Sequence, residues 1–423
     1  MKKRFLTVAL SLVMGFGVAA SLASCGEAGD DKGEITLPDY ENIEVPDYSD
    51  VVIPEDFKFG LICLHDETST YDKNFIDAAR RAVEEMGLTS GQFIMKTGIP
   101  ELAECKTAAE DLVDQGCDLI FADSFGHEPF VKEAAEENPE VEFCHATGVT
   151  AASSGLDNFH NAFASIYEGR YLAGVVAGMK LNEMIEAGEF TAEEAKIGYV
   201  GAYTYAEVIS GYTSFYLGAK SVCPTVTMDV QFTGSWFDIS AEKSTAESLI
   251  AGGCKLISQH ADSMGAPSAC EEAGVPNVSY NGSTFEACPE TFLVSSYIDW
   301  TPYFKYIIAK AAMGEEIADD WTGTIKTGSV KLTNIGGNAA AEGTVDKVIE
   351  IRDKLVDGSL AVFDTSKFTV GGETLTSYMV DIDGDGTKEK EAVKDGVFQE
   401  SLFRAAPYFD VKIDGITLLN EKV

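Results

Sequence analysis

The sequence of 423 residues is poor in positive charge, with 31 Lys and Arg against 69 Asp and Glu, so that its formal net charge is −38. A surface with this excess of negative charge repels phosphate backbones and anionic lipid headgroups. We therefore expect no nucleic-acid partner, and a strongly anionic ligand only at a locally basic site. Neutral and cationic small molecules remain as candidate ligands.

The sequence also lacks the short motifs that accompany common catalytic sites. It contains no G-x-S-x-G, H-E-x-x-H, P-loop or G-x-G-x-x-G pattern, and its five histidines provide few general bases. A nucleoside hydrolase is the enzymatic alternative, but it requires aspartates around a metal near the first strand. His65-Asp66-Glu67 matches that requirement poorly. We predict a protein that is not an enzyme and has no catalytic residue, cofactor or metal.

Cysteine pairs of the zinc-binding type are absent as well. The nine cysteines include no C-x-x-C pair, and most of those after Cys25 lie within or beside apolar segments, as Cys63 does in Leu61–Leu64. We interpret the eight cysteines after Cys25 as small core residues. A disulfide between some pair stays open, because an exported protein can oxidise its thiols.

An apolar run of nearly membrane-spanning length is present only at the start of the chain. Lys2-Lys3-Arg4 precede the run from Phe5 to Ala20, and small residues lead to Cys25. This pattern predicts a lipoprotein signal peptide over 1–24, cleaved so that Cys25 carries lipid such as palmitate. A transmembrane helix is the alternative. Two glycines, the lack of a cationic stop and the terminal cysteine argue against it.

The residues that follow are rich in Gly, Asp, Glu and Pro, with scattered apolar side chains. Such a composition buries no core, so we predict an acidic flexible tether over 25–55. A coil of roughly 30 residues spans about 30 Å root-mean-square. The folded body would then work at the extracytoplasmic face of the cell membrane.

Short apolar strands alternate with amphipathic helices in two comparable blocks. The first begins with a strand near Phe57–Leu64 and the second with Lys196–Val200. This alternation predicts an α/β protein with two doubly wound parallel sheets, hence two lobes. We assign 56–165 to lobe 1 with 292–325 crossing back. Lobe 2 receives 166–291 and part of the C-terminal segment, and 326–423 form a variable C-terminal extension.

Aromatic and polar residues gather directly after the predicted strands. Ligands of open α/β sheets bind beyond these carboxyl ends. Aromatic plates with a few polar edges form a slot suited to a planar heteroaromatic ring. We predict Tyr71 and Phe125 as the wall from lobe 1, and Trp236 and Asp262 as the wall from lobe 2, with Tyr203 as a further contact.

Several stretches in these loops resemble one known family, over nearly the whole body from Phe57 to about Met313. The stretches are Ser124–His127, His145–Gly148, Ile166–Gly174, Ser235–Asp238, Gln259–Ser263 and Asp299–Tyr303. The chain is similar to the basic-membrane-protein family of substrate-binding lipoproteins of ABC transporters, and most to its purine-binding branch. The resemblance implies a type I periplasmic-binding-protein fold with a hinge, and a monomeric receptor that delivers a purine or related ring to permease subunits.

The resemblance also bears on the ligand. It implies stacking by Tyr71 and Trp236 and a contact from Asp262 to the ring edge or a sugar hydroxyl. Nucleoside-binding members have an aspartate and a lysine where this chain has Asn281 and Asp299. We therefore favour a nucleobase such as adenine, with Asn281 near the ring. A purine nucleoside, riboflavin and a sensory receptor without transport stay as alternatives.

The remaining polar candidates have simpler interpretations. Asp66 is retained as a ligand contact, although it and Glu67 are equally typical of a helix cap. We expect Glu168 and Arg170 to form a salt bridge at the hinge. The loop Asp381–Gly386 opens like a calcium loop, but its twelfth position is Ala392, so we predict a polar hairpin turn there.

Overall fold

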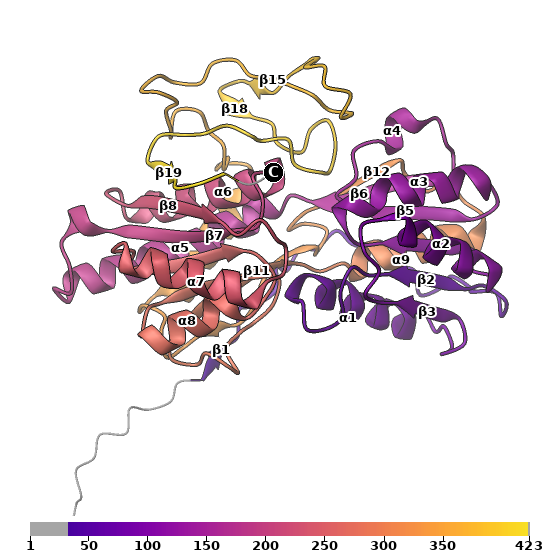
Figure 1. The fold of residues 1–423 in the computed structure, drawn as a ribbon, viewed down its shortest axis with the longest axis horizontal. Coiled ribbons are helices and arrows are strands. Elements are labelled where there is room, and N and C mark those ends of the chain that lie inside the picture. Colours follow the sequence, from indigo (N-terminus) through magenta and orange to yellow (C-terminus); the bar gives the residue numbers. More distant parts are fainter. Residues whose placement is uncertain (1–32, 422–423) are drawn as a thin grey trace, which may run out of the picture. The chain divides into compact units, whose positions relative to one another are not determined.

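The computed structural model describes residues 33–421. The predicted signal peptide, Cys25 and the first residues of the predicted tether lie outside the described residues. Within the described range, no helix has the length and apolarity needed to cross a membrane. The described residues form two lobes and a C-terminal extension (Figure 1).

Lobe 1 is built around a six-stranded sheet in which all neighbouring strands are parallel. In spatial order its strands are β12 (Asp320–Gly323), β6 (Phe159–Ala164), β5 (Glu142–Ala146), β4 (Leu119–Ala122), β2 (Phe59–Ile62) and β3 (Phe93–Lys96). The central strands β2, β4 and β6 are buried at every position. This matches a parallel sheet that is covered on both faces.

Helices cover both faces of this sheet. They are α1 (Thr70–Glu85), α2 (Ala103–Asp114), α3 (Glu128–Glu137), α4 (Ala151–Ser154) and α9 (Thr301–Met313), with the short 3₁₀ helix η1 (Phe125–His127) before α3. The cores formed by α1 and by α2 with α3 are separate clusters, so these helices lie on opposite faces. Ser69 caps α1, since its hydroxyl accepts the amide of Asp72.

Lobe 2 contains a seven-stranded sheet that is parallel except for one edge strand. Its order is β13 (Val330–Leu332), β11 (Phe292–Ile298), β10 (Asn277–Tyr280), β9 (Leu256–His260), β7 (Lys196–Gly201), β8 (Thr227–Phe232) and β19 (Ile416–Leu418). Strand β13 is antiparallel to β11. The two lobes together confirm the predicted α/β class with two doubly wound sheets.

Helices also cover both faces of the lobe 2 sheet. They are α5 (Ile166–Glu186), α6 (Ala206–Val222), α7 (Ile239–Ala251), α8 (Gly265–Ala273) and α10 (Thr344–Val356), and the 3₁₀ helix η2 (Ala192–Glu194) precedes β7. Helices α5 and α6 pack backbone to backbone. A Cβ on Gly174 would collide with the carbonyl of Phe215, and one on Gly218 with that of Tyr171. These two glycines therefore set the separation of α5 and α6.

The chain crosses between the lobes after β6, after β11 and after β12. The structure corrects one predicted boundary, because residues 292–298 form β11 inside the lobe 2 sheet and the return to lobe 1 starts only with α9. The sequence shows a strand there, but a strand's own residues do not reveal which sheet it joins.

The structure corrects the predicted flexible tether over residues 34–45. Strand β1 (Glu34–Ile35) pairs antiparallel with β14 (Ile335–Gly336). Farther along, the amide of Glu44 donates to the carbonyl of Lys326 at 2.6 Å, and the Arg352 guanidinium donates to the carbonyl of Pro38 at 2.6 Å. This segment, residues 34–45, is held by these hydrogen bonds and by Leu37 and Tyr40, which pack against the core. Scattered apolar side chains are enough to order it because backbone groups are also paired.

The predicted C-terminal extension over 326–423 is corrected at its start, because β13 joins the lobe 2 sheet and α10 packs against α5 of lobe 2. The C-terminal extension is therefore residues 357–421, which are irregular except for short strands. They are β15 (Met379–Val380), β16 (Lys390–Glu391), β17 (Val393–Lys394) and β18 (Val397–Phe398), while β19 joins lobe 2. Strands β15 and β16 form the predicted hairpin at 381–386. The carboxylate of Asp381 accepts the amides of Gly384 and Gly386, which closes the turn. Asp381, Asp383 and Asp385 gather in this turn, and the expectation that it binds no calcium stays a prediction.

The eight described cysteines are all buried and unbridged. Burial raises the pKa of the Cys254 thiol to about 12 and that of Cys288 to about 11. This agrees with their interpretation as core residues.

Candidate functional site

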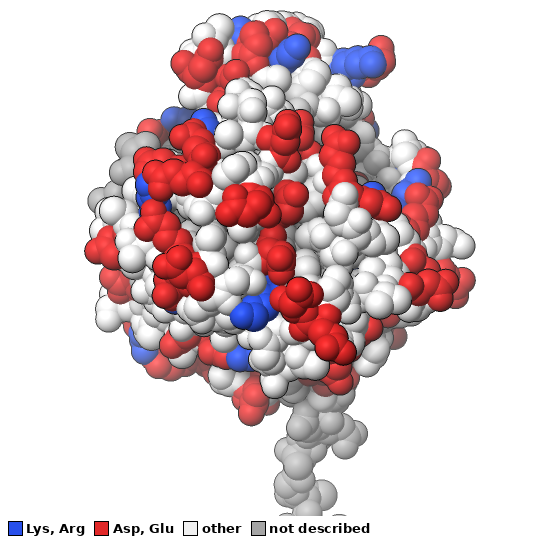
Figure 2. All heavy atoms as spheres, turned by 90° about the vertical axis from the view of Figure 1, so that its right-hand side faces the viewer, with Lys and Arg blue, Asp and Glu red and all other residues white. Residues whose placement is uncertain are grey.

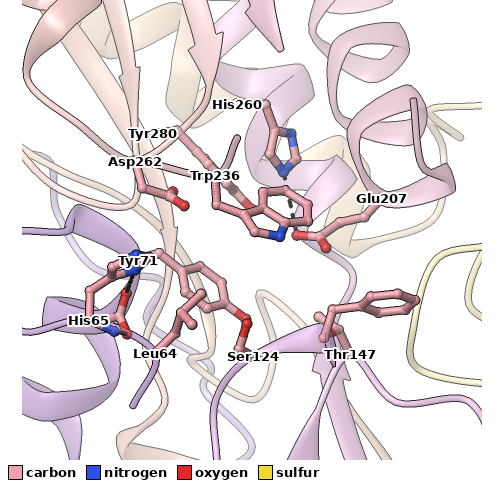
Figure 3. Close-up of a pocket in the computed structure, with 12 residues that line it drawn as sticks. Leu64, His65, Tyr71, Ser124, Thr147, Glu207, Trp236, His260, Asp262 and Tyr280 are labelled. Carbon is pink, nitrogen blue, oxygen red and sulfur yellow. Dashed lines mark hydrogen bonds and ion pairs between the residues drawn. The ribbon is translucent and has the colours of Figure 1, made fainter. Parts of the chain in front are cut away.

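A slot lies between the carboxyl ends of the strands of the two lobes. It is lined by Leu64, His65, Tyr71, Asp72, Ser124, Phe125, Thr147, Glu207, Trp236, His260, Asp262 and Tyr280. The residues numbered below 150 come from lobe 1 and the others from lobe 2 (Figure 3). The slot therefore sits where this class of sheet places its ligands.

Tyr71 forms the floor contributed by lobe 1. It is the second residue of α1, and its hydroxyl donates to the carbonyl of Asp123 at 2.8 Å. Its ring also packs edge-on against Phe75, with centroids 4.9 Å apart. Because the hydroxyl and the ring are both fixed, Tyr71 presents one face to the slot in a single orientation.

Trp236 faces Tyr71 from lobe 2 (Figure 3). It lies after β8 and is supported from behind by Tyr203, whose ring meets it edge-on with a centroid distance of 5.2 Å. Tyr203 in turn stacks on Tyr205 at 5.1 Å. Tyr203 thus supports the indole and is not among the residues that line the slot, and its predicted contact with a ligand stays a prediction.

Asp262 lies at one end of the slot, and its side chain is buried. Burial, together with repulsion from Glu242, Asp72 and Glu207, raises the pKa of Asp262 well above its ordinary value. Asn281 donates from Nδ2 to Asp262 Oδ1 at 3.4 Å. Asn281 therefore positions the carboxyl group without itself lining the slot.

Glu207 lies at the other end of the slot, connected to a buried arginine by a chain of hydrogen bonds. Arg170 Nη2 donates to Tyr199 Oη at 2.6 Å, Tyr199 Oη lies 3.4 Å from His260 Nδ1, and His260 Nε2 lies 3.4 Å from Glu207 Oε1. Arginine only donates, so Tyr199 is left to donate to Nδ1, and Nε2–H then points at Glu207. Burial lowers the pKa of His260, in agreement with this neutral ring.

Two further carboxyl groups lie on the lobe 1 side of the slot, Asp72 in its lining and Asp123 buried behind it. Asp72 accepts the amide of His65 at 2.7 Å and the hydroxyl of Ser69 at 2.6 Å. Asp123 is completely buried, and burial followed by repulsion from Asp72 raises its pKa well above the ordinary value. Together with Cys63 these two form a compact cluster. Burial and the repulsion between the two carboxyl groups favour the protonated form of Asp123.

The lobes touch across the slot. The amide of Thr70 donates to the carbonyl of Asp262 at 3.0 Å, and ring contacts join His65 to Phe237 and Phe125 to Tyr205. The free space in the slot measures only ≈ 20 Å³, which is about the volume that one water molecule needs. A ring can therefore enter only when the lobes separate.

The structure brings four predicted residues together in the slot: Tyr71, Phe125, Trp236 and Asp262. It does not bring Asp66 there. Asp66 is exposed and accepts the amide and hydroxyl of Thr68 in the turn before α1. Asp66 therefore stabilises the turn before α1, close to the helix-capping role that the sequence analysis gave as its alternative. The residue that caps α1 is Ser69.

Two other expectations are corrected. Arg170 and Glu168 form no salt bridge, because residues two apart on α5 point in different directions. Arg170 points under lobe 2, between the rings of Tyr199, Phe215 and Tyr280. Asp299, also outside the slot, is bound by Arg81 at 3.1 Å and Lys331 at 3.0 Å beside the hinge.

The sequence-based interpretation missed Glu207, Thr147 and Tyr280. Tyr280 is the last residue of β10, a strand end of the kind that revealed its neighbours, whereas Glu207 lies in the first turn of α6. Thr147 carries a further mark, a φ of +63°, which is unusual for a β-branched residue. No sequence pattern predicts a positive φ at a threonine.

Comparison with known proteins places this site in a family. Residues 60–364 match the Bmp family, described as "ABC transporter substrate-binding protein PnrA-like". A Haloferax volcanii protein named "Putative ABC transporter glucose-binding protein TsgA13" is 30% identical over 69% of this chain and 70% of its own length. A purine-binding protein of Brucella abortus is 32% identical over 58% of this chain and 63% of its own length.

A solved structure shows the same fold. An ABC transporter solute-binding protein of Aeropyrum pernix aligns with a TM-score of 0.61 and 16% identity, covering 72% of this chain and 92% of that one. The family and fold are those of extracytoplasmic receptors that bind solutes without chemical conversion and work with transporter permeases. With its two lobes closing on an aromatic slot, this chain belongs to the Bmp family of PnrA-like ABC transporter substrate-binding proteins.

Proposed function

We propose that this protein is a lipid-anchored receptor that binds a purine in the slot and delivers it to an ABC importer. The observation that carries the proposal is the pairing of Tyr71 and Trp236, which face one another from different lobes. A flat ring between them would contact both lobes at once. Stacking on each aromatic contributes about 0.5–1.5 kcal/mol beyond the buried area.

The charges around the slot restrict the kind of ring. Asp72, Glu207 and Asp262 line it, and no lysine or arginine lies among its described lining residues. Glu207 accepts hydrogen bonds, and Asp262, whose raised pKa favours the protonated form, can donate as well as accept. A ring with both N–H donors and ring-nitrogen acceptors fits these groups, and a phosphate or carboxylate does not. The hydroxyl of Tyr280 is buried with no protein partner, so it is available to the ligand. An aminopurine such as adenine meets these conditions.

The acidic surface agrees with such a ligand. Figure 2 shows Asp and Glu side chains spread over the lobe 1 face, with few Lys and Arg between them. This field repels anionic solutes before they reach the slot. It has no such effect on a neutral purine.

Closure would follow from contact with both lobes. A ligand shifts an equilibrium between open and closed forms only by its difference in affinity for the two. A ring that touches both Tyr71 and Trp236 supplies that difference, and the permease would then recognise the closed form. A sensory receptor without a permease would close on its ligand in the same way. Transport assays distinguish this sensory role from delivery to an importer.

Calorimetric titration of the purified protein tests the ligand. We expect adenine or another purine to bind, with riboflavin and glucose as alternative ligands and AMP as the anionic control. Binding of glucose with no binding of any purine would overturn the proposal. For the anchor, we expect a palmitate label on the wild type and none on Cys25→Ala.

A further inference from the structure

Five carboxyl groups gather around the slot. Asp72, Glu207 and Asp262 belong to its lining. Asp123 repels Asp72 from one side and Glu242 repels Asp262 from the other, and the side chains of Asp123 and Glu242 are completely buried. A ligand in the slot would therefore be surrounded by acidic groups from both lobes.

None of these five carboxyl groups forms an ion pair with a lysine or arginine among residues 33–421. The ion-pair partners that they have are histidines: His65 with Asp72, His127 with Asp123 and His260 with Glu207. Elsewhere the protein does pair a buried carboxylate with strong cations, as it does for Asp299 with Arg81 and Lys331. Buried acidic groups without such a partner are costly to ionise, so the slot lacks a counter-charge.

We propose that the slot binds its ring as a cation, either an N-alkylated or a protonated heteroaromatic ring. The inference rests on the proposed function, which places a flat ring between Tyr71 and Trp236. It adds positive charge as the property of the ring for which the slot selects. Such a ring supplies the counter-charge that the protein itself does not provide.

The aromatic walls favour the same ligand. The faces of Tyr71 and Trp236 carry the negative part of the ring quadrupole and attract a cation placed over them. Arg170 lies 5.0 Å from the ring centroid of Tyr280 and weakens the attraction of that ring for a second cation. A flat cation stacked between Tyr71 and Trp236 has Asp262 and Glu207 near its two edges (Figure 3).

Asp262 would lose a proton when such a ligand binds. Burial, followed by repulsion from Glu242, Asp72 and Glu207, favours its protonated form in the closed protein. Among the described residues, Asn281 is the one side chain bonded to its carboxyl group. A cation beside this carboxyl group favours the ionised form. Binding should therefore release a proton, and the affinity for a permanent cation should fall as the pH decreases.

Calorimetry with the full mature chain and three probes tests the inference. The first probe, 7,9-dimethyladeninium, is a permanent cation, and the second, 8,9-dimethyladenine, is a neutral ring of the same size. Adenine is the third and tests the proposed function itself. We expect the cation to bind at least about tenfold more tightly than its neutral counterpart at about pH 7, with a smaller ratio at about pH 5.

Three variants identify the groups that select the charge. Asp262→Asn should weaken the cation at least about tenfold and change 8,9-dimethyladenine less than about threefold, and Glu207→Gln should act in the same direction. Glu373→Gln removes one negative charge from an exposed position and is the matched control that should change neither. Titrations in two buffers of different ionisation enthalpy measure the released proton, which should be absent in Asp262→Asn.

The inference is overturned if the neutral ring binds as tightly as the cation, or if adenine binds and the cation does not. Equal losses for both dimethylated probes in Asp262→Asn and Glu207→Gln would overturn it as well. A cation that binds the wild type without release of a proton would contradict the pairing with Asp262. Failure of all three probes to bind would instead overturn the proposed function.

Discussion

Arg170 donates a hydrogen bond of 2.6 Å to the hydroxyl of Tyr199 beneath the lobe 2 sheet, although no carboxylate forms an ion pair with it among residues 33–421. The guanidinium also reaches Ser258 on β9 at 3.1 Å and Ser296 on β11 at 3.4 Å. Rings of three aromatic residues surround it. A single buried cation thus connects the strands that carry the lobe 2 half of the slot.

Replacing this cation should destabilise the fold. We expect Arg170→Met to lower the free energy of unfolding by about 3 kcal/mol, because buried oxygen atoms lose their donor. Urea unfolding measures the change. Arg80→Met is the control, since Arg80 forms an exposed pair with Glu67 and should change the stability by less than about 1 kcal/mol. Equal stability of the two variants would contradict the structural role of Arg170.

Removing the indole of Trp236 should weaken purine binding about tenfold or more, because the ring would lose its stacking partner from lobe 2. Trp236→Phe keeps an aromatic plate and should lose less. Calorimetry with adenine measures both variants. If Trp236→Ala stays within about threefold of the wild type, the stacking assignment is wrong.

Glu400 should make the protein less stable as the pH rises. Burial raises its pKa from 4.5 to about 7, so the folded state keeps a proton that the unfolded state has lost. Stability from this group is present near pH 5 and disappears as the pH rises through about 7. The loss between pH 5 and pH 8 is about 2–3 kcal/mol.

Glu400→Gln should remove that part of the decline. Unfolding measured at both pH values gives the difference, and the exposed Glu373→Gln is the control. Burial also raises the pKa values of Glu168 and Glu242 to about 7. Part of the loss of stability with rising pH therefore remains in every variant. A Glu400→Gln protein with the same pH dependence as the wild type would contradict the assignment.

The segment over residues 34–45 should resist hydrogen exchange. The amide of Glu44 is bonded to Lys326, whereas Val52, a few residues later, is 85% exposed and its amide has no partner among the described residues. We expect the Glu44 amide to exchange at least about tenfold more slowly than that of Val52, after correction for intrinsic rates. Equal exchange rates of the two amides would instead support the predicted flexible tether over this segment.

The repeating pattern of strands and helices was enough to predict both lobes, because period and burial act locally. The same reasoning found Tyr71, Phe125, Trp236 and Asp262, since each follows a strand that the pattern identifies. Sheet membership was harder. The apolar pattern of β11 is equally compatible with the sheet of lobe 1 and that of lobe 2. Strand β19 has only three residues, too few for a recognisable pattern.

The polar contacts of the site could not be derived from neighbours in the sequence. Arg170 was paired with Glu168 because they are close in the chain, but its partners come from β7, β9, β10 and β11. Only the completed sheet brings these groups together. Glu207 was missed for the same reason, since its partner His260 is 53 residues away.

Strand β19 completes the edge of the lobe 2 sheet beside β8, from which it is separated by nearly the whole second half of the protein. Pairing between segments so distant is slow, since a long loop must close before its contacts form. Until residues 416–418 arrive, β8 has an unpaired edge that another chain can use. We therefore expect newly exported molecules to need protection from aggregation until synthesis and export are almost finished.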